Sequence, residues 1–184
     1  MAEGGYMIGK MAQLLYPEGS TITLNNGMDA AIEETRQQLK EENVILFEPV
    51  FISGKKMARV DILIKTGKII ELIEVKAKSY ADGDSFLTKA GAIKSDWQSY
   101  IDDVCFQTMI VEECHPDFTI KPFLMLVNKS KPTSMDNLAS QFEIKNLTTF
   151  ETEGFRFFDV VFHGNEDEFR YNHFQEKIDV SKAA

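Results

Sequence analysis

The chain has 184 residues and a formal net charge of −9, with 43% hydrophobic and 27% charged residues. This is the composition of a globular domain with a hydrophobic core, and the net negative charge argues against a non-specific nucleic-acid coat. No run of apolar residues approaches the length of roughly 18 that a transmembrane helix needs.

Two helices and a strand are predicted in the first third of the chain. Apolar residues at helical spacing predict a short helix over residues 7–16, which Pro17 ends. Asparagine and glycine residues offer cap chemistry for a second helix over residues 28–42. A strand that contains Glu48 is expected over residues 44–52.

The central feature of the sequence is a β-hairpin over residues 60–76. Two runs rich in β-branched residues flank a Lys-Thr-Gly-Lys turn, a pattern typical of two strands joined by a tight loop. With Thr66 and Gly67 as a two-residue loop, Asp61 lies opposite Leu72. Side chains alternate between the faces of a strand. One predicted face then carries Asp61, Leu72, Glu74 and Lys76, and the other carries Val60, Ile62, Ile64, Ile73 and Val75.

Asp61 and Glu74 are expected to be diagonal neighbours, roughly 7–8 Å apart at the backbone. That separation suits a divalent cation between the two carboxylates, each of which binds at about 2.0–2.6 Å. Without a cation, two close carboxylates and Lys76 would be costly to bury on an inward face. The alternatives are that this face is solvated, with ordinary surface charges, or that a one-residue bulge changes the register.

A loop over residues 79–94 and a long helix over residues 96–114 are expected to follow the hairpin. Asp103 and Gln107 lie four positions apart and share one face of this helix, different from its core side. The residues predicted on its core side are Trp97, Ile101, Val104 and Cys105.

The remainder of the chain gives weaker patterns. A strongly apolar strand is predicted over residues 118–127, and a further strand over residues 142–147. Residues 155–162 are rich in aromatic side chains and form a strand or a helix. The final segment, which ends at Ala184, is expected to be exposed.

Charge and cysteine content bear on the substrate and the setting. Between Phe51 and Lys94 there are nine basic and five acidic residues, so the hairpin lies in the only basic region, where an anionic substrate meets the least repulsion. Cys105 and Cys114 lie in one predicted helix and are poorly placed to pair with each other. A reduced, cytoplasmic setting is therefore expected.

The order helix, three strands, helix, strand resembles the core of the PD-(D/E)XK nuclease superfamily. Asp61 and then Glu74-Val75-Lys76 on the next strand match the positions of the metal carboxylates and the lysine in that superfamily. Further motifs, which span residues 5–128, resemble a mostly uncharacterised bacterial RecB-type family. These motifs are Gly5-Tyr-Met-Ile-Gly9, Leu15-Tyr-Pro-Glu-Gly19, Phe47-Glu-Pro, Arg59-Val-Asp-Ile-Leu, Ile73-Glu-Val-Lys and Asp103-Val-Cys-Phe-Gln107.

The resemblance implies an α/β fold with a restriction-endonuclease-like core, in which helices flank a mixed β-sheet in the order α-β-β-β-α-β. We expect one nuclease-like domain over residues 1–184, with a core at about 28–128, an N-terminal helical extension at 5–27 and a C-terminal extension at 129–184. Because the chain starts and ends abruptly against the family pattern, we expect it to be a fragment of a longer protein.

The resemblance also implies a metal site. Asp61 and Glu74 are expected to bind Mg²⁺ or Mn²⁺, with the Val75 carbonyl and the Glu48 carboxylate as further ligands. Such a cation prefers oxygen ligands, polarises a phosphodiester and lowers the pKa of an attacking water. Lys76 is expected to orient that water or to offset charge that develops on the phosphate.

Two residues of the long helix complete the expected site. Gln107 would position the metal-bound water or the DNA backbone, and Asp103 would orient a neighbour. Structural alternatives remain open. Lys76 would then be an exposed strand lysine, Glu48 a solvated glutamate, and Gln107 a helix glutamine bound to a backbone carbonyl.

Two functions follow from this comparison. The leading hypothesis is a Mg²⁺- or Mn²⁺-dependent deoxyribonuclease of DNA repair, exonuclease-like, that acts on single-stranded DNA or on double-stranded ends. The alternative is a catalytically silent PD-(D/E)XK domain that binds nucleic acid or a protein partner in a larger repair or defence protein. Gly9 favours the alternative, because RecB-type nucleases often carry a histidine near this position. A small-molecule binder is disfavoured, since the sequence has no glycine-rich phosphate loop.

Overall fold

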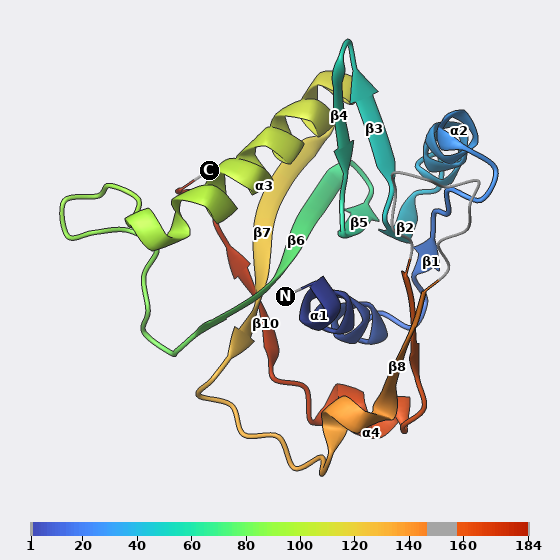
Figure 1. The fold of residues 1–184 in the computed structure, drawn as a ribbon. Coiled ribbons are helices and arrows are strands. Elements are labelled where there is room, and N and C mark those ends of the chain that lie inside the picture. The colour runs from blue at the N-terminus through green and yellow to red at the C-terminus, as the bar shows by residue number, and fades with distance from the viewer. Residues whose placement is uncertain (1, 147–157, 184) are drawn as a thin grey trace.

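A mixed six-stranded β-sheet forms the centre of the computed structural model, which describes residues 2–146 and 158–183 (Figure 1). Its strands are β1 (Ser20–Thr21), β2 (Asn43–Phe47), β5 (Ile62–Thr66), β6 (Ile69–Tyr80), β7 (Thr119–Asn128) and β10 (Gln175–Asp179). They lie in the order β1-β2-β5-β6-β7-β10. The β1/β2 and β6/β7 pairs are parallel and the other neighbours antiparallel. The prediction of an α/β fold with a mixed central sheet is confirmed.

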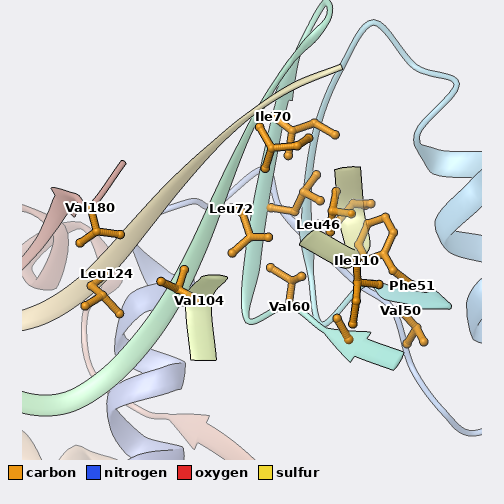
Figure 2. Packing of buried hydrophobic residues seen from close by; sticks show 14 of the residues in the cluster. Leu46, Val50, Phe51, Val60, Ile70, Leu72, Val104, Ile110, Leu124 and Val180 are labelled. Atoms are coloured by element: carbon orange, nitrogen blue, oxygen red, sulfur yellow. The ribbon is translucent and has the colours of Figure 1, made fainter. Parts of the chain in front are cut away.

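Helices cover both faces of this sheet (Figure 1). The helices are α1 (Ala2–Leu14), α2 (Met28–Gln38), α3 (Ser95–Cys114) and α4 (Glu166–Tyr171), with a short 3-10 helix, η1 (Leu138–Gln141). Val104 of α3 packs in a buried cluster with Leu72 and Leu124 (Figure 2). Ala12 of α1 packs in another cluster with Ile73. Since neighbouring residues of a strand point to opposite faces, α3 and α1 lie on opposite sides of β6.

The helices agree with the sequence-based predictions to different extents. The long helix α3 matches the predicted range 96–114 to within one residue. The first helix begins earlier than predicted, at Ala2, and the second ends earlier, at Gln38. Helix ends are difficult to place from sequence, because local propensity changes little over the last turn.

The predicted strand over residues 44–52 is two strands, and this prediction was wrong in its extent. β2 ends at Phe47, and β3 (Val50–Ser53) pairs with β4 (Lys56–Arg59) in a separate two-stranded hairpin. Glu48, between β2 and β3, has φ 59°, a left-handed conformation that breaks a strand. The order α-β-β-β-α-β is therefore interrupted by an additional hairpin, which projects from the sheet at the top of Figure 1.

The turn of the central hairpin also differs from the prediction. Thr66 pairs with Ile69, so the two-residue loop is Gly67-Lys68 rather than Thr66-Gly67. Gly67 has φ 56° at the first central position of the turn, where glycine adopts the left-handed conformation without a steric cost. The conformational freedom of this glycine sets the register of β5 and β6.

The corrected register shifts the pairing of β5 and β6 by two residues. Within the two strands each side chain stays on its predicted face, because the alternation along a strand has a period of two. The last pair of this ladder is Ile62 with Ile73. Just beyond it lie Asp61, which precedes Ile62, and Glu74, which follows Ile73. Asp61 was predicted opposite Leu72, and this part of the prediction was wrong.

Val60 does not belong to the predicted apolar face. It packs with Leu72 and Leu46 in the cluster beneath α3 (Figure 2), whereas Ile62 and Ile73 pack in the cluster beneath α1. The strict alternation fails here because Val60 and Asp61 lie between β4 and β5, outside both strands.

The C-terminal segment packs against α1. β8 (Phe142–Asn146) pairs with β9 (Phe158–Phe162), in agreement with the strand predicted from residue 142; residues 147 and 155–157 of the two predicted ranges lie outside the described residues. Phe169 of α4 is buried with Met11 and Leu14 of α1, and Arg170 Nη1 donates a hydrogen bond to the Leu14 carbonyl at 3.2 Å. Figure 1 shows this C-terminal layer below α1.

The expectation that the final segment is exposed was wrong for its first part. β10 extends the sheet by pairing with β7, and Val180 is 1% exposed. Most side chains in Gln175–Asp179 are polar, as is usual for a strand at the edge of a sheet. The hydrophobic pattern therefore gave no signal for it.

Replacement of Gly67 tests the assigned turn. Gly67→Ala should lower the free energy of unfolding by about 1 kcal/mol, because an L-residue is strained at positive φ, even though the new Cβ would meet no atom within 4 Å. Gly9→Ala is the matched control in α1, where the Cβ also meets nothing within 4 Å. It should stabilise the protein by about 0.5–1 kcal/mol. Urea unfolding measures both, and a stabilising effect at Gly67 would contradict the turn.

Candidate functional site

The predicted site lies beside the start of β5, where the chain returns to the six-stranded sheet from the separate β3–β4 hairpin. Phe47 and Ile62 form the last pair of β2 with β5. Beyond it, the Glu48 amide donates to the Asp61 carbonyl at 3.1 Å, and the chain then turns away into β3. β6 continues past this point to Tyr80. Glu48 and Asp61 therefore stand beside the part of β6 that carries the expected site.

Asp61 is bound to β6 through its side chain. The ladder between β5 and β6 ends at the Ile62–Ile73 pair, and Asp61 Oδ2 accepts a hydrogen bond from the Val75 amide at 2.7 Å. A backbone N–H that lacks a ladder partner needs another acceptor when it is shielded from water. The carboxylate of Asp61 supplies that acceptor, so it is held against β6.

Glu74 points toward α3 and is 6% exposed. Its Oε2 accepts a hydrogen bond from Gln107 Nε2 at 2.6 Å, and its Oε1 lies 2.6 Å from Lys76 Nζ. Glu74 and Lys76 are two positions apart, so both side chains emerge from the same face of β6. Both carboxylate oxygens of Glu74 therefore have a protein partner.

Lys76 bridges β6 and α3. Its Nζ lies 2.6 Å from Asp103 Oδ2 as well as from Glu74 Oε1. Asp103 and Gln107 are one helical turn apart on the same face of α3, as predicted. Gln107 is buried, at 7% exposed, whereas Asp103 is half-buried, so their face adjoins the buried surface of the helix.

Burial and neighbouring carboxylates raise the pKa of the acidic residues of the site. Burial raises the pKa of Asp61 well above its usual value, and the carboxylates of Glu74 and Glu48 raise it further, against the hydrogen bond from Val75. Burial likewise raises the pKa of Glu74, although Lys76 and Gln107 act in the opposite direction.

The pKa values of Glu48 and Lys76 are each shifted by burial and by oppositely charged neighbours. Burial raises the pKa of Glu48, and Arg59 opposes this shift through an ion pair with Nε 3.1 Å from Oε2. Burial alone would lower the pKa of Lys76, but Glu74 and Asp103 outweigh it, so the pKa of Lys76 is raised. Lys76 is therefore a protonated ammonium at neutral pH.

The structure brings together most of the residues that the sequence singled out. Asp61, Glu74, Lys76 and Gln107 are linked directly or through Val75, whose contribution in the structure is its backbone amide. Glu48 lies in the bend after β2 and interacts with Asp61 through its charge. Glu48 was predicted within a strand, and its place in a bend at positive φ corrects that expectation.

Sequence reasoning missed two neighbours of the site. Arg59 pairs with Glu48, and the Tyr100 ring centroid lies 6.0 Å from Lys76 Nζ. Tyr100 precedes Asp103 by three residues, so helical spacing places both on neighbouring positions of α3. This three-residue interval was the signal in the sequence that could have identified Tyr100 as a neighbour of the site. The Arg59–Glu48 pair joins β4 to the end of β2 and has no local signature.

The available metal ligands at this site are oxygen atoms. Within residues 2–146 and 158–183, no group of three or more His, Cys, Asp or Glu residues is arranged to hold a metal ion. Asp61 and Glu74 contribute carboxylates, and no histidine or cysteine contacts either of them among the described interactions. This donor set is suited to a hard cation that retains several water ligands, and a cation would offset the repulsion that raises the pKa of Asp61.

Two surface grooves lie away from this group of residues. One, of about 330 Å³, is bordered by Ile32 and Arg36 of α2 and by Ile52 of β3. The other, of about 300 Å³, lies between α3 and β7 and is bordered by Cys105 and Met109 of α3 and by Pro122 of β7. Neither groove is lined by a residue of the predicted site.

No protein-family model, curated protein or solved structure was found to match this chain. Among the described helices, none combines the length and the hydrophobicity that crossing a membrane requires.

The raised pKa of Asp61 predicts that removing its charge stabilises the fold. A carboxyl whose pKa is higher in the folded than in the unfolded state makes folding less favourable as pH rises through that interval. Each unit of the difference corresponds to about 1.4 kcal/mol. Asp61→Asn keeps an oxygen that can accept from the Val75 amide, so it should raise the free energy of unfolding at pH 8 and have a smaller effect at pH 4.

Urea unfolding of the wild type and the variant over this pH range checks the expectation. Asp61→Ala is the informative control, because it removes the charge but leaves the Val75 amide without an acceptor, which costs about 1–3 kcal/mol. An Asp61→Asn variant that is less stable than the wild type at every pH would contradict the repulsion among the three carboxylates.

Proposed function

We propose that this chain is a PD-(D/E)XK nuclease module with a restriction-endonuclease-like core, which hydrolyses DNA in the presence of Mg²⁺ or Mn²⁺. One observation carries the proposal: Glu48, Asp61 and Glu74 come from different segments and lie close enough that Glu48 and Glu74 raise the pKa of Asp61, and Glu74 raises that of Glu48, beside a protonated lysine. Strongly shifted groups of this kind are more frequent in functional sites than elsewhere.

A hard cation would be held by Asp61 and Glu74, with the Val75 carbonyl and Glu48 as further ligands. When bound, such an ion polarises a phosphodiester and generates a nucleophile from water at neutral pH. Removal of the repulsion among the carboxylates would contribute to its affinity. The cation preference follows from the ligands, since Mg²⁺ and Mn²⁺ both favour oxygen donors.

Lys76 is suited to stabilise negative charge rather than to accept a proton. Its ammonium group is held between two carboxylates, which raise its pKa. A fixed positive charge at a phosphate stabilises the charge that develops in the transition state. We assign Lys76 to this role.

Gln107 is suited to orient a water molecule. Its Nε2 is used by Glu74, while its Oε1 is buried without a hydrogen-bond partner among the described residues. A buried acceptor without a donor costs free energy, and a water beside Glu74 would satisfy it. This is consistent with the positioning of an attacking water in a hydrolytic site.

DNA, as single strands or double-stranded ends, is the substrate that we propose. The segment between Phe51 and Lys94, which supplies most of the site, has nine basic and five acidic residues in a chain of net charge −9. A polyanion is therefore least repelled at this part of the chain, and a bound cation would reduce the repulsion further.

One observation favours a catalytically silent DNA- or protein-binding module as the second candidate. Both oxygens of Glu74 already have protein partners, Lys76 and Gln107, so the local structure is complete without a cation. Cleavage and binding assays on the same DNA separate the two functions.

Incubation of labelled single- and double-stranded DNA with Mg²⁺ or Mn²⁺ tests the proposal. The wild type should degrade DNA, and EDTA should abolish the activity. Lys76→Ala should lower the cleavage rate by about 10²–10³, and Glu74→Ala should reduce it to background. Asp102→Asn is the control and should keep the wild-type rate, because Asp102 is exposed and its hydrogen bond among the described residues is to Gln98.

Purified wild type that binds labelled DNA but releases no product with either cation would contradict the nuclease and support the binding module. Cleavage that persists in Glu74→Ala would show that a contaminating nuclease is responsible.

A further inference from the structure

Lys76 has two anionic partners, and they come from different elements. Glu74 Oε1 on β6 and Asp103 Oδ2 on α3 each lie 2.6 Å from Lys76 Nζ. The Glu74 side chain is 8% exposed, that of Lys76 23%, and that of Asp103 44%. Lys76 therefore lies between an inner carboxylate and an outer one that faces solvent.

The outer partner is held in place by the packing of its helix. Ile101 and Val104 flank Asp103 in sequence and are completely buried, so the backbone of α3 has a fixed position against the sheet. Gln107, one turn further on, is bonded to Glu74. Asp103 thus presents its carboxylate to Lys76 from a helix that is packed against the sheet.

The proposed function requires Glu74, but not Asp103, to bind the cation. A Glu74 carboxylate that binds a cation has a weaker ion pair with Lys76, because its negative charge is then shared between two positive groups. A lysine has a flexible four-carbon stem and loses rotamer entropy when it is fixed. Without a second anion, Lys76 would stay on Glu74 and compete with the cation, or move into solvent.

We propose that Asp103 is a positioning residue that retains Lys76 in the site when Glu74 engages a cation. Without a cation, Lys76 pairs with both carboxylates. When Glu74 binds the cation, Asp103 alone holds Lys76 beside the phosphate. The inference rests on the proposed function for its purpose, but the contact between Asp103 and Lys76 is a property of the protein itself. Removal of Asp103 should therefore have effects that can be measured without DNA.

Three variants on α3 separate positioning from loss of charge. Asp103→Asn removes the ionic partner of Lys76. Asp102→Asn removes the same charge from the adjacent residue, which contacts Gln98 and not Lys76. Asp103→Glu restores a carboxylate and should recover wild-type behaviour, at least in part. Thermal unfolding of each variant establishes that it is folded before the other measurements are made.

The first measurement is the rate at which Lys76 is acetylated by a limiting amount of N-hydroxysuccinimide acetate, followed by peptide mass spectrometry without divalent cations. Asp103→Asn should accelerate modification of Lys76 several-fold over the wild type, since the ammonium loses its outer partner. Asp102→Asn should leave the rate unchanged, and Asp103→Glu should return it toward the wild-type rate.

The second measurement is Mn²⁺ binding by calorimetry. Asp103→Asn should weaken binding by about tenfold, the usual effect of losing a residue that supports a metal ligand, and Asp102→Asn should have little effect. In the cleavage assay, Asp103→Asn should lower kcat more than it raises KM, because Lys76 acts on the phosphate only once the substrate is bound.

Unchanged acetylation of Lys76 in Asp103→Asn, or equal acceleration in Asp102→Asn, would overturn the inference even if the wild type is an active nuclease. The nuclease proposal fails separately, when the wild type cleaves no DNA. In that case a faster acetylation specific to Asp103→Asn still supports the positioning role, since this measurement needs neither cation nor substrate.

Discussion

The hydrogen bond between the Val75 amide and the Asp61 carboxylate joins β6 to the chain at the point where the sheet splits, and the rest of the site depends on it. The Asp61 backbone also accepts from the Glu48 amide, so one residue fixes the bend after β2 and the beginning of β5. A side chain in this position is held by the backbone around it. The carboxylate consequently remains beside Glu74 although the two repel each other.

This arrangement is costly, and the stability of the protein comes from elsewhere. Ile62, Leu63, Leu72 and Ile73 are completely buried within the hairpin that carries the site, and each such side chain contributes about 1.5–3 kcal/mol of hydrophobic free energy. Against that background, the fold tolerates carboxyl groups whose pKa is raised by burial and by neighbouring carboxylates. Functional sites are commonly places where local stability is sacrificed.

Helix α3 gives the site its second layer. Its buried side packs on the sheet through Val104 and Ile101, and the adjoining side presents Asp103 and Gln107 to β6. The two contacts differ in character. Gln107 donates to Glu74 in a buried position, whereas Asp103 binds Lys76 at the edge of the solvent. A rigid helix can support both because positions four apart lie above one another.

Local patterns in the sequence determined much of this protein. The period of two along residues 60–76 was sufficient to place Glu74 and Lys76 on one face, and it survived an error of two residues in the register, since that error preserves parity. Apolar spacing identified α3 and β7, and the four-residue interval between Asp103 and Gln107 placed them on one face of the helix. These features depend on backbone geometry that repeats along the chain.

Other features were decided only by the tertiary structure. The bend at Glu48, the transfer of Val60 to the cluster beneath α3, and the addition of β10 to the sheet each depend on contacts between segments distant in sequence. Whether Gln107 faces solvent or Glu74 is likewise set by how α3 packs on the sheet. The periodicity of a sequence assigns a side chain to a face, but only the packing of one element on another determines what that face meets.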